Sequence, residues 1–137
     1  MTLYMLDTNI ASHLIRGDIP AVRQRIVRVA IESIVISSVT EAELRYGLAK
    51  RGYPKALTQA VQLFLERVET LPWSSQVAAV YAELRTKAES AGSPLAPLDM
   101  MIAAHAKAAD ATLVTRDKAF KAKTLELTLE DWSEGTH

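Results

Sequence analysis

The sequence predicts an α/β domain of three layers, in which helices cover both faces of a central parallel sheet. Three short apolar runs indicate buried strands, because each is followed at once by polar residues and none alternates strictly. Helical patterns lie between these runs, and strands that alternate with helices are typical of such a sheet. The runs are Leu3–Leu6, Ile34–Ser37 and Thr112–Thr115.

Two weaker apolar runs, Val68–Leu71 and Leu125–Leu127, bring the predicted sheet to four or five strands. All 137 residues are assigned to a single domain, because this length suits one domain better than two. The two linker-like segments, Gly52–Pro54 and Ala91–Pro97, are interpreted as loops within that domain. A content of 49% hydrophobic and 23% charged residues is that of an ordinary globular protein.

Apolar residues recur at helical spacing between the strands. The clearest such segment, from Val77 to Ala88, follows Ser74 and Ser75, which are good N-cap residues. Pro97 opens a further helix that runs through Ala109, since proline fits the first turn of a helix. Two earlier helices are indicated by Val22, Ile26 and Val29, and by Leu57, Val61, Phe64 and Leu65.

Charge and cysteine content exclude several classes of protein. Sixteen basic residues balance sixteen acidic ones, which excludes a polycation that coats nucleic acid by bulk charge but not a local nucleic-acid site. The chain has no cysteine, so disulfide scaffolds, zinc fingers and cysteine nucleophiles are excluded. Neither a signal peptide nor a membrane span is recognisable, and we expect a cytoplasmic protein without a membrane partner.

Four acidic residues stand where an α/β sheet usually binds ligands. Asp7 directly follows the first predicted strand, Glu43 lies little more than one helical turn past the second, and Asp117 comes two residues after Thr112–Thr115. These three lie near the carboxyl ends of strands, where open parallel sheets form their binding crevice. Asp99, in the first turn of the helix opened by Pro97, needs the tertiary fold to join them.

Carboxylates that gather in one place repel one another unless a cation neutralises them. Mg²⁺ and Mn²⁺ prefer all-oxygen ligands, and Mg²⁺ binds through one or two carboxylates together with substrate phosphate oxygens. Such a site suits in-line displacement at phosphorus. The sequence shows no glycine-rich phosphate loop, zinc-binding histidine pair or serine nucleophile elbow.

Each acidic residue also has a purely structural interpretation. Asp7 and Asp117 suit N-caps of the helices that follow them, and Asp99 would complement a helix N-terminus. Glu43 completes a capping box with Thr40. Only the joint placement of the four favours a functional site.

Four ordered segments resemble the PIN-domain ribonucleases, and most closely the VapC toxin branch of bacterial toxin–antitoxin systems. The resemblance covers nearly the whole chain, down to Glu130–Trp132. It implies a three-layer α/β/α PIN-like domain with endoribonuclease activity that depends on Mg²⁺ or Mn²⁺. The segments are Met5–Asn9, Ile36–Gly47, Pro97–Ala104 and Leu113–Asp117.

The resemblance also assigns roles to residues of these segments. Asp7 and Asp99 correspond to the principal metal ligands, Glu43 to a ligand that binds directly or through water, and Asp117 to the most variable acidic position. Thr115 corresponds to a hydroxyl that orients the first aspartate, and Asn9 to a polar residue beside the ligands. Since all four acidic positions are intact, we expect an active enzyme that leaves a 5′-phosphate and a 3′-hydroxyl.

The same resemblance implies partners. We expect a homodimer that is blocked by a cognate VapB-type antitoxin, with operator DNA bound only through the antitoxin. The expected substrate is RNA, specifically tRNA, with the anticodon region of initiator tRNA as the first candidate. Other VapC toxins cut elongator tRNAs or ribosomal RNA.

Basic residues cluster unevenly along the chain. His105 to Lys123 contains five lysines or arginines and two acids, whereas Thr124 to His137 contains four acids and no lysine or arginine. The basic stretch flanks the fourth acidic residue, so it either holds RNA phosphates or forms a solvated helix face. The candidate RNA-binding residues are Arg116, Lys118 and Lys121, with Arg16 and Arg45 as weaker candidates; Arg23, Arg25 and Arg28 suit a solvated helix face.

Other side chains receive structural interpretations. His13 and His105 lie near the acidic motifs and are interpreted as structural residues or as residues that support the ligands, not as a catalytic base. Met100, Met101 and Ile102 are assigned to the core, and Trp73, Tyr46, Tyr53 and Tyr81 to the core or a dimer interface rather than to base stacking.

Three other functions compete with the ribonuclease. A phospho-receiver module would need an acceptor aspartate after the third strand, and Val68–Trp73 supplies none. A metal-dependent DNA nuclease or phosphatase would use the same carboxylates. A catalytically weak PIN domain would serve only as a binding module.

Overall fold

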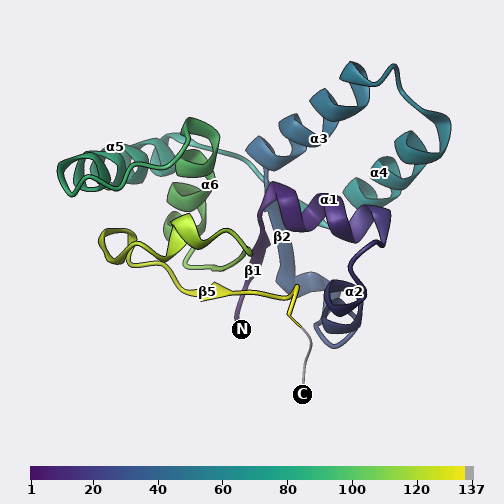
Figure 1. Ribbon diagram of the computed structural model, residues 1–137, viewed down its shortest axis with the longest axis horizontal. Helices are drawn as coiled ribbons and strands as arrows, with labels where there is room; N and C mark the ends of the chain where they lie inside the picture. The colour runs from purple at the N-terminus through teal and green to yellow at the C-terminus, as the bar shows by residue number, and fades with distance from the viewer. Residues whose placement is uncertain (135–137) are drawn as a thin grey trace.

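A parallel sheet crosses the middle of the molecule (Figure 1). Its strands follow one another in the order β3 (Glu69–Leu71), β2 (Ile34–Ser37), β1 (Tyr4–Leu6), β4 (Thr112–Val114) and β5 (Leu129–Glu130). The computed structural model describes residues 1–134. Met5, on the central strand, is in register with Val35 on one side and Leu113 on the other. Within the described residues, every pairing between these strands is parallel.

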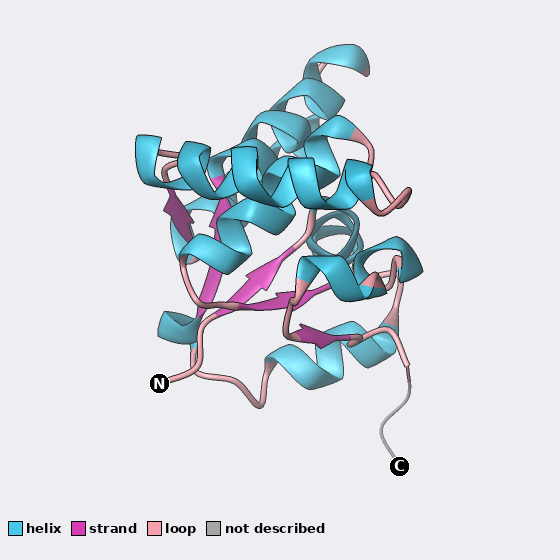
Figure 2. Cartoon of the chain, turned by 90° about the vertical axis from the view of Figure 1, so that its left-hand side faces the viewer, coloured by secondary structure: helices cyan, strands magenta, loops and turns pink. Residues whose placement is uncertain are grey.

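Helices lie on both faces of the sheet, as Figure 2 shows, and the predicted three-layer α/β/α architecture is confirmed. Within residues 1–134, no helix is long and apolar enough to cross a membrane. The α-helices of this part of the chain are α1 (Thr8–Arg16), α2 (Pro20–Ile26), α3 (Ser38–Lys50), α4 (Lys55–Arg67), α5 (Ser75–Ser90) and α6 (Pro97–Ala108).

Successive residues of the central strand pack into two different apolar cores. Met5 is fully buried in the core that includes residues of α5 and α6, such as Leu84 and Ile102. The next residue, Leu6, points to the opposite face and is buried with residues of α1 and α4, such as Ile10 and Phe64. Since side chains alternate along a strand, both faces of β1 must be apolar, which explains its continuous apolar sequence.

The predicted strand at Leu125–Leu127 is wrong, and the fifth strand is Leu129–Glu130 instead. Leu125 ends a 3₁₀ helix, Lys123–Leu125, and is fully buried in the core. Glu126 then adopts a left-handed backbone (φ 51°), which an extended strand does not permit. The other four predicted strands are confirmed, with their ends shifted by at most one residue.

Arg25 is not on a solvated helix face, contrary to the prediction. Its Nη2 lies 3.2 Å from Glu130 Oε1, and its guanidinium lies over the ring of Trp132, 5.1 Å from the centroid. Trp132 Nε1 donates to the same Glu130 oxygen over 2.9 Å. The cluster of Arg25, Glu130 and Trp132 therefore ties the last strand to α2.

We expect Arg25→Ala to destabilise the fold by about 1–2 kcal/mol, since a cation–π contact and a half-buried ion pair are lost together. Urea unfolding followed by tryptophan fluorescence measures this free energy of unfolding. Arg28→Ala, an exposed change on the same segment, serves as the control. Equal stability of the two variants would show that the cluster contributes nothing.

Candidate metal and active site

The four predicted acidic residues line one open hollow of about 560 Å³ at the carboxyl ends of β1, β2 and β4. Asp7 follows β1, Glu43 projects from α3, Asp99 stands in the first turn of α6, and Asp117 follows β4. The tertiary fold brings Asp99 to the other three, as the prediction required. The remaining lining residues are Thr8, Asn9, Ser12 and Arg116.

Asp7 is the most deeply buried of the four, with 5% of its surface exposed. Its Oδ1 accepts a hydrogen bond of 2.8 Å from the Ile10 backbone N–H, so it also caps α1, as its structural interpretation proposed. Burial raises the pKa of the Asp7 carboxyl, and the charges of Asp99 and Asp117 raise it further. Hydrogen bonds from Thr115 and from the Ile10 N–H oppose this rise in pKa only in part.

Asp99 responds to the same neighbours. Burial raises the pKa of the Asp99 carboxyl, and repulsion by Asp117 and then by Glu43 adds to the rise. Loss of solvation and mutual repulsion both disfavour the charged form of a carboxylate, and a bound cation opposes both effects. The hollow therefore favours a cation that would neutralise them.

Glu43 does not form the predicted capping box with Thr40. The N-cap of α3 is Ser37, whose hydroxyl accepts from the Val39 N–H over 3.1 Å. Glu43 is bound instead by Thr8, whose Oγ1 donates to Glu43 Oε1 over 2.6 Å and lies 3.1 Å from Thr40 Oγ1. Thr8 was not among the predicted site residues, although it stands between Asp7 and Asn9 in the first motif.

Asp117 and Thr115 together organise the loop after β4. Asp117 Oδ1 accepts from the Ala119 N–H over 2.9 Å and so caps the 3₁₀ helix Lys118–Lys121, as its structural interpretation proposed. The Asp117 N–H donates to Thr115 Oγ1 over 3.0 Å. The Thr115 hydroxyl also acts to lower the pKa of Asp7, so this threonine influences two of the acidic residues.

Two hydrogen-bonded links hold α3 against α6, the helices that carry Glu43 and Asp99. His105 Nδ1 lies 2.7 Å from Ser37 Oγ, and burial lowers the pKa of His105, which favours the neutral ring. Trp73 bridges the same helices. Its backbone N–H donates to Ser38 Oγ, and its indole Nε1–H donates to the Met101 carbonyl, each over 3.0 Å. The structural interpretations of His105 and Trp73 are confirmed.

The donor chemistry of the hollow fits Mg²⁺ or Mn²⁺, since its ligands would be carboxylate and hydroxyl oxygens. Within residues 1–134, no three acidic or histidine side chains already converge as a ready-made ligand set. Mg²⁺ needs only one or two carboxylates and retains several waters. Asp7 and Asp99 supply that number in the hollow.

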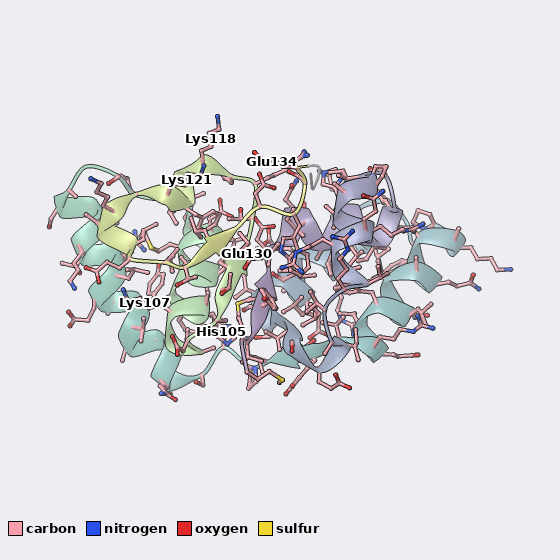
Figure 3. All side chains as sticks on the ribbon, turned by 90° about the horizontal axis from the view of Figure 1, so that it is seen from below. His105, Lys107, Lys118, Lys121, Glu130 and Glu134 are labelled. Atoms are coloured by element: carbon pink, nitrogen blue, oxygen red, sulfur yellow. The ribbon has the colours of Figure 1, made fainter. Side chains whose placement is uncertain are left out.

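The candidate RNA-binding lysines and arginines line several different hollows. Arg116 lines the acidic hollow, whereas Lys118 and Lys121 line an adjacent one with acidic residues of the C-terminal segment, including Glu134. Figure 3 shows Lys118, Lys121 and Glu134 along the same edge of the molecule. The acidic C-terminal stretch thus lies beside the basic one as far as Glu134, and residues 135–137 lie outside the described part.

Arg45 does not reach the acidic hollow, contrary to the prediction. It is exposed and pairs with Glu41 over 2.8 Å, beside a separate hollow that Gln62 of α4 also lines. Arg16 lines a pocket next to the acidic hollow and lies 3.6 Å from Asp18. His13 pairs with the same Asp18 over 2.7 Å, which confirms its structural role.

Comparisons with known proteins agree with this geometry. The PIN domain family matches residues 4–124. The chain is 37% identical over 134 residues to ribonuclease VapC2 of Rickettsia felis (96% of this chain, 99% of that protein). It is 32% identical to the tRNA(fMet)-specific endonuclease VapC of Shigella flexneri (97% and 100%). Its fold superposes with a TM-score of 0.87 and 34% identity on the crystal structure of Rickettsia felis VapBC2 bound to a promoter DNA fragment (96% and 99%).

Proposed function

Because the chain belongs to the PIN-domain family, and to its VapC branch, we propose that it hydrolyses RNA as the toxin of a type II toxin–antitoxin system. The observation that carries this proposal is the gathering of four carboxylates at one edge of the sheet, where burial and mutual repulsion raise the pKa values of Asp7 and Asp99. We propose that the enzyme depends on Mg²⁺ or Mn²⁺.

In this proposal, Asp7 and Asp99 would hold the cation, with Glu43 and Asp117 as ligands or as acceptors for its waters. Bound Mg²⁺ or Mn²⁺ supplies activation of water and stabilisation of charge at phosphorus. Thr8 fixes the position of Glu43, Thr115 would orient Asp7, and Asn9 adds a polar side chain to the lining of the hollow.

Arg116 is the cation best placed to hold an RNA phosphate, since it lines both the acidic hollow and the hollow of Lys118 and Lys121. Its positive charge would offset the repulsion between the carboxylates and the RNA backbone. Lys118 and Lys121 would bind phosphates farther along the strand.

The proposed partners follow from the relatives. The Shigella flexneri relative is named as specific for tRNA(fMet), and we propose tRNA as the substrate, with initiator tRNA as its first candidate. The Rickettsia felis relative was solved as a VapBC2 complex on promoter DNA. We propose a VapB-type antitoxin for this chain, contact with operator DNA only through that antitoxin, and a homodimer of the toxin.

The test is cleavage of total tRNA by the purified, antitoxin-free chain with Mg²⁺ or Mn²⁺. We expect cuts at discrete sites that leave 5′-phosphates, and complete loss of cutting in EDTA. Ribosomal RNA and single-stranded DNA are assayed in parallel. Cutting of DNA alone would replace the proposal with a DNA nuclease, and absence of metal binding would favour a binding module.

We expect Thr8→Val to weaken Mg²⁺ binding about 10–100-fold, because residues that orient metal ligands typically contribute that much. Valine keeps the shape of threonine but removes the hydroxyl that holds Glu43. Isothermal titration calorimetry with Mg²⁺ measures the affinity. Thr58→Val is the matched control, since the Thr58 hydroxyl is buried in α4 without a hydrogen-bond partner in the described part of the chain. If both variants bind Mg²⁺ like the wild type, Thr8 does not position a ligand.

A further inference from the structure

A second, smaller pocket of about 120 Å³ adjoins the acidic hollow and lies between α1, α3 and α4. The two cavities share Thr8, Ser12 and Glu43, so anything that occupies the smaller pocket touches the edge of the proposed active site. Apart from Thr8 and Glu43, the residues that line this pocket have no role in the proposed metal site.

Apolar side chains form one part of the wall of this pocket. Leu44 and Leu48 line it from α3, and Leu57 and Val61 line it from α4. A dry cavity of roughly 150 Å³ accepts one benzene ring, so this pocket has the size of a single flat ring and is too small for a helix. Apolar side chains with a few polar groups at the mouth are typical of small-ligand pockets.

Gly47 indicates that the pocket is kept open. It lies inside α3, where glycine destabilises a helix relative to alanine, and its φ is not positive. A Cβ placed there would meet no atom within 4 Å, so packing within residues 1–134 does not require glycine. Since Gly47 lines the pocket, a side chain at this position would reduce its volume.

Two arginines line the pocket, and Arg16 also lies 3.6 Å from Asp18. Arg16 and Arg51 both line it and are exposed, and no ion pair within residues 1–134 engages Arg51. An apolar slot beside two guanidinium groups is complementary to a nucleotide, which combines a flat ring with a phosphate.

We infer that this pocket binds one nucleobase of single-ring size from the RNA strand, next to the phosphodiester held at the carboxylates, with Arg16 and Arg51 on the adjoining phosphate. The inference rests on the proposed ribonuclease function and adds a determinant of sequence preference to it. Single-stranded RNA is commonly recognised through bases that are splayed out of the strand, and the pocket would read such a base.

The test compares Gly47→Leu, which fills the pocket, with Ala49→Leu, an exposed change on the same helix. The substrate is a synthetic stem–loop RNA that carries the cleavage site mapped in total tRNA. We expect Gly47→Leu to lower kcat/KM at least about tenfold, since the contact of one base contributes on that order. Ala49→Leu should cut like the wild type. Gly47→Ala should raise Tm, because alanine favours the helix, and should lower kcat/KM by a smaller factor than Gly47→Leu. A loss of activity in a more stable chain would come from the filled pocket and not from misfolding.

A substrate change completes the test. An abasic nucleotide is placed in turn at each position beside the cut. In the wild type, one position should lower kcat/KM as Gly47→Leu does, and in Gly47→Leu the same abasic RNA should cause no further loss. The inference of a base pocket would be overturned if Gly47→Leu cuts like the wild type, or if the losses in kcat/KM from Gly47→Leu and from the abasic RNA multiply when the two are combined. Either result would leave the proposed ribonuclease function intact. A wild type that binds metal but cuts no RNA would overturn both.

Discussion

Asp99→Asn is expected to lower the rate of RNA cleavage about a thousandfold while the chain remains folded. The amide is a weaker metal ligand than the carboxylate, and the cation contributes several kcal/mol to the stability of the transition state. Each 1.4 kcal/mol corresponds to tenfold in rate, which gives the expected factor. The fold should persist because burial, and repulsion by Asp117 and Glu43, disfavour the charged Asp99 carboxylate in the folded chain. A neutral asparagine at this position removes both unfavourable effects.

Single-turnover cleavage of the mapped RNA with saturating Mg²⁺ measures this rate. Asp110→Asn is the matched control, since Asp110 lies just past the other end of α6, is exposed, and has a left-handed backbone (φ 53°) that asparagine also tolerates. We expect the control to cut like the wild type. If Asp99→Asn retains a tenth or more of the wild-type rate, the carboxylate is not a principal ligand and the proposed site is wrong.

The strands and the acidic edge could be predicted from the sequence because local rules determine them. Apolar runs such as Ile34–Ser37 are typical of strands in a sheet covered on both faces, and Asp7 follows its strand directly. The position of Asp99 could not be derived from such rules, since it depends on how α6 packs. The resemblance to PIN domains supplied that step.

The errors arise where tertiary contacts override local patterns. Leu125 belongs to an apolar run, yet it is buried as the end of a 3₁₀ helix and not as a strand residue. Arg25 shares a segment with other arginines, yet it contacts Glu130, 105 residues away in sequence. Glu43 has capping-box spacing from Thr40, but α3 begins two residues before Thr40, and the partner of Glu43 is Thr8 on another helix. None of these partners has a signal in the local sequence.

Asp7→Asn is expected to raise the Tm of the metal-free chain at pH 7, although it removes a residue of the proposed active site. Burial, with the charges of Asp99 and Asp117, raises the pKa of Asp7 in the folded state above its ordinary value of 3.8. Between that ordinary value and the raised one, the folded chain binds the proton more tightly than the unfolded chain does. The free energy of unfolding therefore falls as pH rises through this interval, and the loss is complete above the raised pKa.

Asparagine removes this cost and still caps α1, since asparagine and aspartate are nearly equivalent at an N-cap. We expect a rise of about 3 °C or more at pH 7, which corresponds to roughly 1 kcal/mol in a domain of this size, and no rise below the ordinary carboxyl pKa. Differential scanning calorimetry in EDTA across this pH range tests the sign. Glu83→Gln, an exposed change on α5, should leave the pH dependence unchanged.

Saturating Mg²⁺ should reverse the order of stability. A cation that binds the folded chain alone stabilises it in proportion to the logarithm of its concentration over Kd, so the wild type should gain more than Asp7→Asn. The same charge that destabilises the metal-free fold would then be the source of metal affinity. An Asp7→Asn chain that is less stable than the wild type in EDTA at pH 7 would contradict this account, because it would show that the carboxylate is stabilised in its hollow without a cation.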